Sequence, residues 1–341
     1  LRELDRVGLG HNTFTQPART SGTTTDIGWP VKMANEGHNK NCVFFNNTLT
    51  RAPFIGIAQV GNWNFTFEMW NVEGLEMYGN TFSGEIDFAD IHKGNSAYGL
   101  YFHDNVIQLP QLSQYIEDGV RIEVSSDHVR IDNNHFKNLS QGVVFSPYDY
   151  QHDGGGIDVH DIEITRNLFE NMGTLNAMAD STIRFESSAN NPVTRVTNVR
   201  VINNTFIAAT GASGTFSGMS GPHYSGTNDH IDIVNNIFQN YTFRALSFGG
   251  GYNGANTAVT NLTIANNDFN ANTVNGPAFT GSQGSMCVAT NYTNTGNVTV
   301  APQFVSATDF HLAPGSPLIN AGIDAGLPFI GSAPDIGAFE Q

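Results

Sequence analysis

The chain has 341 residues, of which 39% are hydrophobic and 11% aromatic, so it can bury a large core and is not a disordered protein. Only 13% of the residues are charged, and 31 acidic residues against 15 lysines and arginines give a net charge of −16. This balance argues against a nucleic-acid partner, because phosphate binding needs a basic face. No apolar run reaches the roughly 18 residues of a transmembrane helix, so we expect no membrane span.

A four-residue phrase recurs along the chain, as in HNTF from residue 11, GNTF from residue 79 and NNTF from residue 203. The second residue of the phrase is asparagine in all nine copies, at about 32-residue intervals. These asparagines are Asn12, Asn47, Asn80, Asn105, Asn134, Asn167, Asn204, Asn236 and Asn267. A fixed period of this length is the mark of a solenoid, in which each repeat buries its inner face against its neighbours.

The residues around each asparagine predict the path of one repeat. Positions five before, three before and two after it are apolar in every copy, as with Val199, Val201 and Phe206 around Asn204. The two-residue spacing indicates a strand, and the asparagine then marks a corner after which the chain turns back inward. Asparagine tolerates left-handed backbone conformations and bonds its neighbours, so identical corners should stack as an asparagine ladder. The sequence therefore predicts an all-β parallel β-helix of about nine coils.

The repeat stops near residue 302, which divides the chain into a β-helix (1–302) and a closing segment (303–341) expected to pack on it. That segment contains DFHLAPGSPLINAG at 309–322 and DIGAFE at 335–340. It resembles the closing segment of many secreted proteins of the pectate-lyase-like superfamily. The resemblance implies a single-stranded right-handed parallel β-helix and a secreted, cell-surface or periplasmic location. It does not fix the chemistry, since that superfamily holds several enzyme classes and non-catalytic adhesins.

A second strand can be aligned downstream of the asparagines, in segments that begin near residues 84, 120, 143, 183 and 243. Alternation points one set of side chains inward: Ile86, Val120, Ile122, Val143, Phe145, Ile183, Phe185 and Phe243. The outward set is polar: Glu85, Asp87, Arg121, Glu123, Ser146, Arg184, Glu186 and Arg244. A polar row along a β-helix predicts a groove for a polysaccharide, with Arg184 and Arg244 binding substrate. The alternative is a solvated face of salt bridges, each of which contributes little to stability.

The densest polar stretch, residues 85–95, resembles the alginate lyases of the chondroitinase-B-like family. The resemblance implies that Glu85 and Asp87 hold Ca²⁺, that Lys93 abstracts the C5 proton of a uronate, and that Arg121 assists. Calcium prefers several hard oxygen ligands and can bridge to a substrate carboxylate. A lysine near cations has a lowered pKa and can act as a base, and the chain has only four lysines. The first hypothesis is thus a lyase that cleaves a uronate-containing polysaccharide by β-elimination.

Two alternatives stay open. A glycoside hydrolase on the same groove needs two carboxyl groups about 5–5.5 Å or about 6.5–9.5 Å apart. Asp87 with Glu123 fits the first separation, and Glu123 with Glu186 fits the second. The acidic net charge favours this alternative, because it repels a polyuronate unless calcium bridges the two. A non-catalytic glycan-binding or adhesin solenoid is the other alternative, and it predicts that the charges of the groove are paired.

A loop beside the predicted groove, residues 148–156, contributes further candidates for substrate binding. Tyr148 and Tyr150 are placed to stack on sugar rings, and His152 is a candidate acid or base. The alternative for this segment is an ordinary corner loop.

Overall fold

We describe the protein from a computed structural model of the whole chain. The structure describes residues 4–16, 31–33, 39–51, 66–92, 99–112, 117–146, 157–175, 180–185, 193–212, 216–221, 227–248, 259–272 and 289–341. These residues form 28 strands and no helix, so the described part of the chain is all-β. It contains no helix that is long and apolar enough to cross a membrane.

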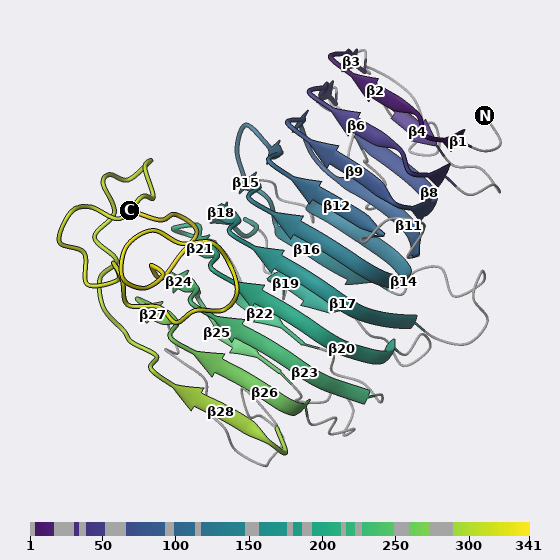
Figure 1. Cartoon of the computed structure of the whole chain (residues 1–341). Helices are drawn as coiled ribbons and strands as arrows, with labels where there is room; N and C mark the ends of the chain where they lie inside the picture. Colours follow the sequence, from purple (N-terminus) through teal and green to yellow (C-terminus); the bar gives the residue numbers. More distant parts are fainter. Residues whose placement is uncertain are drawn as a thin grey trace.

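The strands stack in parallel on three faces of one solenoid, a right-handed parallel β-helix (Figure 1). The first face holds β2 (Gly8–Gly10), β6 (Val43–Phe45), β9 (Leu75–Tyr78), β12 (Leu100–His103), the second half of β14 (Asp118–Asp132), β17 (Ile157–Thr165), β20 (Val193–Ile202), β23 (Thr227–Val234), β26 (Val259–Ala265) and β28 (Tyr292–Thr295).

The second face follows the asparagine corner in each coil. It holds β3 (Thr13–Thr15), β7 (Thr48–Thr50), β10 (Thr81–Phe82), β13 (Val106–Gln108), β15 (His135–Lys137), β18 (Leu168–Met172), β21 (Thr205–Ala208), β24 (Ile237–Gln239) and β27 (Asp268–Asn270). The third face holds β4 (Val31–Met33), β8 (Phe67–Glu73), β11 (Ile86–His92), the first half of β14, β16 (Gln141–Ser146), β19 (Asp180–Phe185), β22 (Phe216–Ser220) and β25 (Arg244–Ser247). Two further short strands lie at the N-terminal end of the solenoid: β1 (Leu4–Asp5) pairs with β5 (Asn39–Lys40), and β5 pairs with β8.

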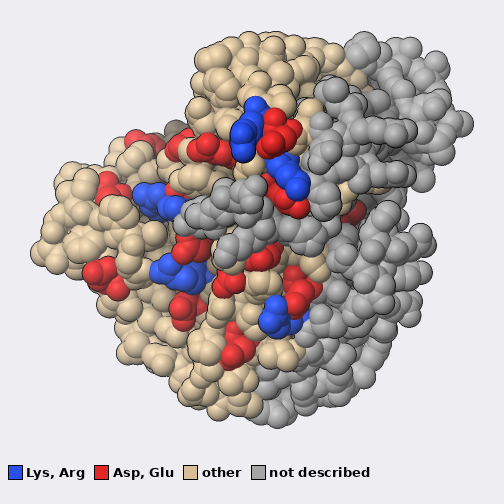
Figure 2. Space-filling model, turned by 45° about the vertical axis from the view of Figure 1, so that its right-hand side comes forward, with Lys and Arg blue, Asp and Glu red and all other residues tan. Residues whose placement is uncertain are grey.

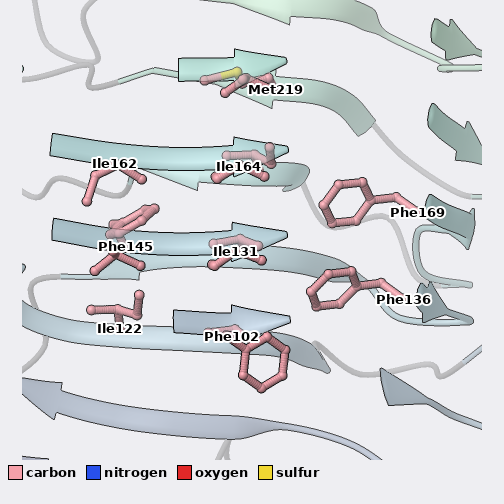
Figure 3. Close-up of a cluster of buried hydrophobic side chains, with 14 of the residues drawn as sticks. Phe102, Ile122, Ile131, Phe136, Phe145, Ile162, Ile164, Phe169 and Met219 are labelled. Atoms are coloured by element: carbon pink, nitrogen blue, oxygen red, sulfur yellow. The ribbon is translucent and has the colours of Figure 1, made fainter. Parts of the chain in front are cut away.

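The core is built from the apolar columns that the repeat predicts. On the first face Phe102 pairs with Ile131, and Ile131 pairs with Ile164 one coil further. On the second face the phenylalanines two residues after the corner stack ring on ring, with centroids 4.8 Å apart for Phe136 and Phe169 (Figure 3). These five side chains are completely buried. Each coil thus contributes the same inward positions to one continuous core.

The corner asparagines form a continuous hydrogen-bonded ladder. The backbone N–H of Asn134 donates to Oδ1 of Asn167 at 2.9 Å, and the Nδ2 of Asn134 donates to the same oxygen at 3.0 Å. Asn167 repeats both bonds to Asn204. Its Nδ2 also donates back to the carbonyl of Ile131 in the preceding coil. The pattern runs from Asn12 through the nine predicted corners and adds a tenth rung at Asn297.

The left-handed backbone lies one residue earlier than the sequence suggested. The residue before each ladder asparagine has a positive φ, for example Asn133 at 53° and Arg166 at 55°. A second left-handed column stands six residues before the ladder and includes His128 and Asp161. The ladder asparagine itself has ordinary backbone angles, so its role is hydrogen bonding, and the tight turn is made by its neighbour.

The outward side chains of the first face form ion pairs across coils. Arg200 lies 2.7 Å from Glu163, and Arg195 lies 2.7 Å from Asp158. Figure 2 shows basic side chains bordered by acidic ones on the surface that it presents. These pairs are 26–44% exposed, so each contributes little to stability.

The closing segment lies against the outside of the C-terminal coils, beside β21, β24 and β27 (Figure 1). Leu312, Leu318 and Ile336 pack on Ile237, and the N–H of Gly337 donates to the carbonyl of Asn235 at 2.8 Å. Its packing on the helix is therefore observed, whereas the division at residue 302 into two units stays a prediction.

Candidate functional site

Three neighbouring strands of the third face carry the same local pattern of an apolar, a charged and an apolar residue. In β8 the charged residue is Glu68, in β11 it is Asp87, and in β14 it is Arg121. The register places Asp87 opposite Glu68 on one side and opposite Arg121 on the other. Since the flanking apolar residues enter the core, the three charged side chains form one column on adjacent coils. The predicted neighbourhood of Asp87 and Arg121 is thus observed.

The two guanidinium groups of this region are held by carboxylates. Arg121 donates from Nε to Oε1 of Glu85 at 3.0 Å and pairs through Nη2 with Asp118. Arg51 forms a bidentate pair with Glu117, at 3.0 and 3.2 Å. Because Arg121 already serves two carboxylates, it is a fixed positive charge next to Asp87 and not a mobile one.

Asp87 is the least satisfied member of the group. Its side chain is 2% exposed, and its Oδ1 is buried without a hydrogen-bond partner. Burial, followed by the negative charges of Glu123, Glu85 and Glu68, raises the pKa of Asp87 well above its usual range, against the opposing effect of Arg121. A buried carboxyl with an unpartnered oxygen is costly unless it binds a proton or a cation.

The pKa of Glu85 is also raised, but unlike Asp87 this residue accepts a hydrogen bond from Arg121. Burial and the nearby Asp118 raise its pKa well above the usual range, although the charge of Arg121 and its hydrogen bond lower it. Glu85 is 1% exposed, so its carboxyl has almost no contact with water. Both carboxyl groups to which the resemblance assigns calcium are therefore buried, and burial raises the pKa of each.

We call Glu68, Glu85, Asp87, Glu117, Asp118 and Glu123 the acidic cluster. All six side chains are at most 8% exposed. Among the side chains that the structure describes there, Arg51 pairs with Glu117, and Arg121 pairs with Glu85 and Asp118. Several buried carboxylate oxygens, among them the unpartnered Oδ1 of Asp87, are a donor set that suits Ca²⁺. The residues present thus fit the calcium site that the resemblance implies.

The outward set is less exposed than a solvated groove would be. Glu85, Asp87, Arg121 and Glu123 point away from the core, yet each is at most 8% exposed. Arg184 lies in the same column as Arg121, two coils further, with Val144 between them. Val144 is completely buried. The part of the column from Glu85 to Val144 is consequently not a row of solvated ion pairs.

The alignment was wrong for Arg244 and Phe243. Arg244 pairs with Ser217, whereas Ser247 is the residue that follows Arg184 and Ser220 in the column. Leu246 and Phe248 enter the core in this coil, and Phe243 remains half-buried with Arg244 over its ring at 4.2 Å. The error is a three-residue slip, and an odd slip exchanges the two faces of a strand.

Five candidates lie outside the described residues: Lys93, Glu186, Tyr148, Tyr150 and His152. Their roles as base, second carboxylate and sugar contacts stay predictions.

Sequence reasoning missed the outer members of the cluster, namely Arg51, Glu68, Glu117 and Asp118. Glu68 had a usable signal, because residues 67–69 repeat the apolar–charged–apolar pattern of residues 86–88 one coil earlier. Glu117 and Asp118 precede the aligned strand, and Arg51 follows β7, so no strand pattern marks them.

Comparisons with known proteins were made for sequence and for structure. No protein-family model and no curated protein sequence matches the chain. Among solved structures, the crystal structure of pectate lyase Pel9A is similar over 98% of this chain and 87% of its own. The two share 15% identical residues at a TM-score of 0.37.

Proposed function

We propose that the protein cleaves a uronate-containing polysaccharide by β-elimination at the acidic cluster, with Ca²⁺ as its cofactor. The observation that supports this most is the group of six buried carboxyl side chains that includes the unpartnered Oδ1 of Asp87. Such a cluster favours a divalent cation with oxygen ligands. A secreted or cell-surface location belongs to the proposal, because the substrate is an extracellular polymer.

In this proposal Asp87, Glu68 and Glu123 would hold a calcium ion, and Glu85 would fix Arg121 beside them. Calcium bound there would neutralise the carboxylate of the uronate and so make its C5 proton more acidic. Arg121 is fixed by Glu85 and Asp118 on the strand next to Asp87, where it orients the sugar carboxylate. Lys93, which directly follows β11 in the chain, removes the C5 proton. The electron pair of the C5–H bond then forms a double bond between C4 and C5, and the bond between C4 and its glycosidic oxygen breaks. The leaving oxygen takes a proton from water and becomes the hydroxyl of the released sugar.

A glycoside hydrolase is the second candidate, and one observation favours it. Asp87 has a raised pKa, and Glu123 is the largest charged contributor to that shift. One carboxyl that keeps its proton beside another carboxyl is the pairing that glycosidases use as acid and base or nucleophile.

A digest of uronate and neutral polysaccharides, with calcium and with chelator, separates the two candidates. Ultraviolet absorbance reports the unsaturated sugar that only elimination forms, and reducing ends report any cleavage. We expect absorbance that depends on calcium. Reducing ends without absorbance would instead indicate a hydrolase, and no product on a broad panel would leave a non-catalytic glycan-binding solenoid.

Variants of Lys93 and Asp87 test the roles of these residues as base and as calcium ligand. Lys93→Ala should abolish product formation, since general base catalysis contributes about 10²–10⁴-fold. Asp87→Asn should lower activity and weaken its dependence on calcium. The matched control is Asp232→Asn, a carboxyl on the first face in β23 that should leave activity unchanged. Full activity in Lys93→Ala would rule out this lysine as the base.

A further inference from the structure

A second group of ligating side chains lies at the corner where the third face turns into the first. Two adjacent coils carry the dipeptides Asp127-His128 in β14 and His160-Asp161 in β17, with acid and imidazole in opposite order. The register pairs Asp127 with His160, so His128 lies opposite Asp161. Each imidazole therefore has a carboxylate beside it along the chain and another across the coil.

The ligand atoms converge on one point. Nδ1 of His160 lies 2.9 Å from Oδ2 of Asp161 and 3.7 Å from Oδ1 of Asp127. Nδ1 of His128 contacts Oδ1 of Asp127 and lies 3.9 Å from Oδ2 of Asp161. Ligand atoms of Asp127, His160 and Asp161 all lie within 4.8 Å of one another, the one such group of three among the described residues.

These separations suit a small metal ion. In a tetrahedral site with metal–ligand bonds of about 2.0–2.2 Å, the ligand atoms are about 3.4 Å apart, which lies between the observed 2.9 and 3.7 Å. The three side chains are 24–38% exposed, so an ion can enter and a water molecule can complete the shell. Nδ2 of Asn198 donates to the other oxygen of Asp161 at 3.0 Å, which orients that carboxylate.

We propose that Asp127, His160 and Asp161 bind a divalent transition-metal ion and that His128 positions Asp127. An imidazole nitrogen with two carboxylates favours ions such as Zn²⁺, Co²⁺ or Ni²⁺ over calcium, which prefers oxygen ligands alone. The site is distinct in chemistry from the acidic cluster, which offers only carboxylates. Because its ligands come from β14 and β17, the bound ion links two neighbouring coils.

The test is calorimetric titration of the intact, chelator-treated protein with ZnCl₂, followed by thermal unfolding with and without Zn²⁺. We expect one Zn²⁺ per chain and a higher Tm, because a ligand that binds only the folded state stabilises it. Loading with Co²⁺ should give a visible absorption band from the bound ion. A titration without heat or saturation would overturn the proposal.

Three variants locate the bound ion. His160→Gln and Asp161→Asn should each weaken zinc binding at least tenfold, and Asp161→Asn keeps the left-handed backbone and an acceptor for Asn198. The control is His230→Gln, whose imidazole pairs with Asp229 at 2.8 Å in the same corner column two coils further. It should bind zinc as the unaltered protein does. Unchanged affinity in the first two variants, with native circular dichroism, would place the zinc elsewhere and refute the site.

Discussion

The asparagine ladder and the acidic cluster are both buried, polar and stacked coil upon coil, but they are satisfied to different degrees. Each inner ladder asparagine uses its Oδ1 and its Nδ2 within the stack, as Asn167 does with Asn134, Ile131 and Asn204. The acidic cluster, among the described side chains, has six carboxyl groups against two guanidinium groups. The ladder thus holds the fold together with bonds made within the stack, whereas Asp87 in the acidic cluster keeps a buried oxygen that suits a proton or a cation.

The largest effect should come from breaking the ladder. Asn167→Ala removes three bonds donated by Nδ2 and two accepted by Oδ1, all buried. We expect a loss of about 3–5 kcal/mol in the free energy of unfolding, at about 1 kcal/mol per bond. Urea unfolding measures it. The control, Asn198→Gly, deletes one exposed bond at a left-handed position and should change stability by less than about 0.5 kcal/mol. A loss below about 1 kcal/mol for Asn167→Ala would contradict a structural role for the ladder.

Removing a positive charge from the cluster should come next. Arg121→Ala leaves Glu85 and Asp118 without their shared cation, and both are almost completely buried. Breaking a buried pair in this way destabilises by about 3 kcal/mol. Urea unfolding beside Arg195→Ala, which breaks a half-exposed pair on the first face, gives the contrast, since that change should stay below about 1 kcal/mol. Equal losses in both variants would show that burial does not separate the two faces.

Asp268, on the second face, is another buried polar side chain that keeps an oxygen without a hydrogen-bond partner. Its Oδ2 is buried without a partner, while its Oδ1 accepts from the N–H of Val300, and burial raises its pKa to about 7. Because the pKa in the folded state is above the unfolded value of 3.8, folding is penalised only when Asp268 is ionised. The penalty is absent below about pH 4, grows up to about pH 7 and is constant above that.

Asp268→Asn should therefore gain stability relative to the unaltered protein as the pH rises. Between pH 5 and pH 8 we expect a relative gain of about 2 kcal/mol, measured by urea unfolding across the pH range. The amide of the variant keeps an oxygen that can accept from the N–H of Val300, and it does not ionise. The difference in stability between the two proteins therefore reports the ionisation of Asp268. A difference that does not vary with pH would mean that Asp268 is not the titrating group.

The smallest expected change in stability has the opposite sign to that of the ladder. In the presence of chelator, Asp87→Asn replaces a buried carboxyl whose Oδ1 has no hydrogen-bond partner with a neutral amide, and it should raise the free energy of unfolding by about 1 kcal/mol. Adding calcium should stabilise the unaltered protein and have less effect on the variant. Thermal unfolding with chelator and with calcium measures both. A destabilised variant without calcium would show that Asp87 has a structural role like that of the ladder asparagines.

The sequence predicted the columns that repeat and failed where the environment of a side chain depends on other segments. The inward positions and the corner asparagines were found because each coil repeats the same residue types at the same offsets. The burial of Asp87 and Glu123 was not predicted, because the sequence pattern of a strand does not show whether other segments pack against its outward side chains. Arg244 was misplaced because β25 offers two alternations, Phe243 with Ala245 or Leu246 with Phe248, and only the pairing with β22 decides between them.

The direction of the ladder has a consequence for how such a chain changes in length. From Asn47 to Asn297, Oδ1 of each ladder asparagine accepts the hydrogen bonds of the asparagine one coil earlier, so the last rung is the one that no further asparagine completes, however many coils precede it. Gain or loss of a whole coil of about 32 residues leaves the number of incomplete rungs unchanged, whereas loss of half a coil breaks the ladder on both sides. Evolution can therefore lengthen or shorten the molecule in whole coils, and a chain that emerges from the ribosome can close each coil as the next one arrives.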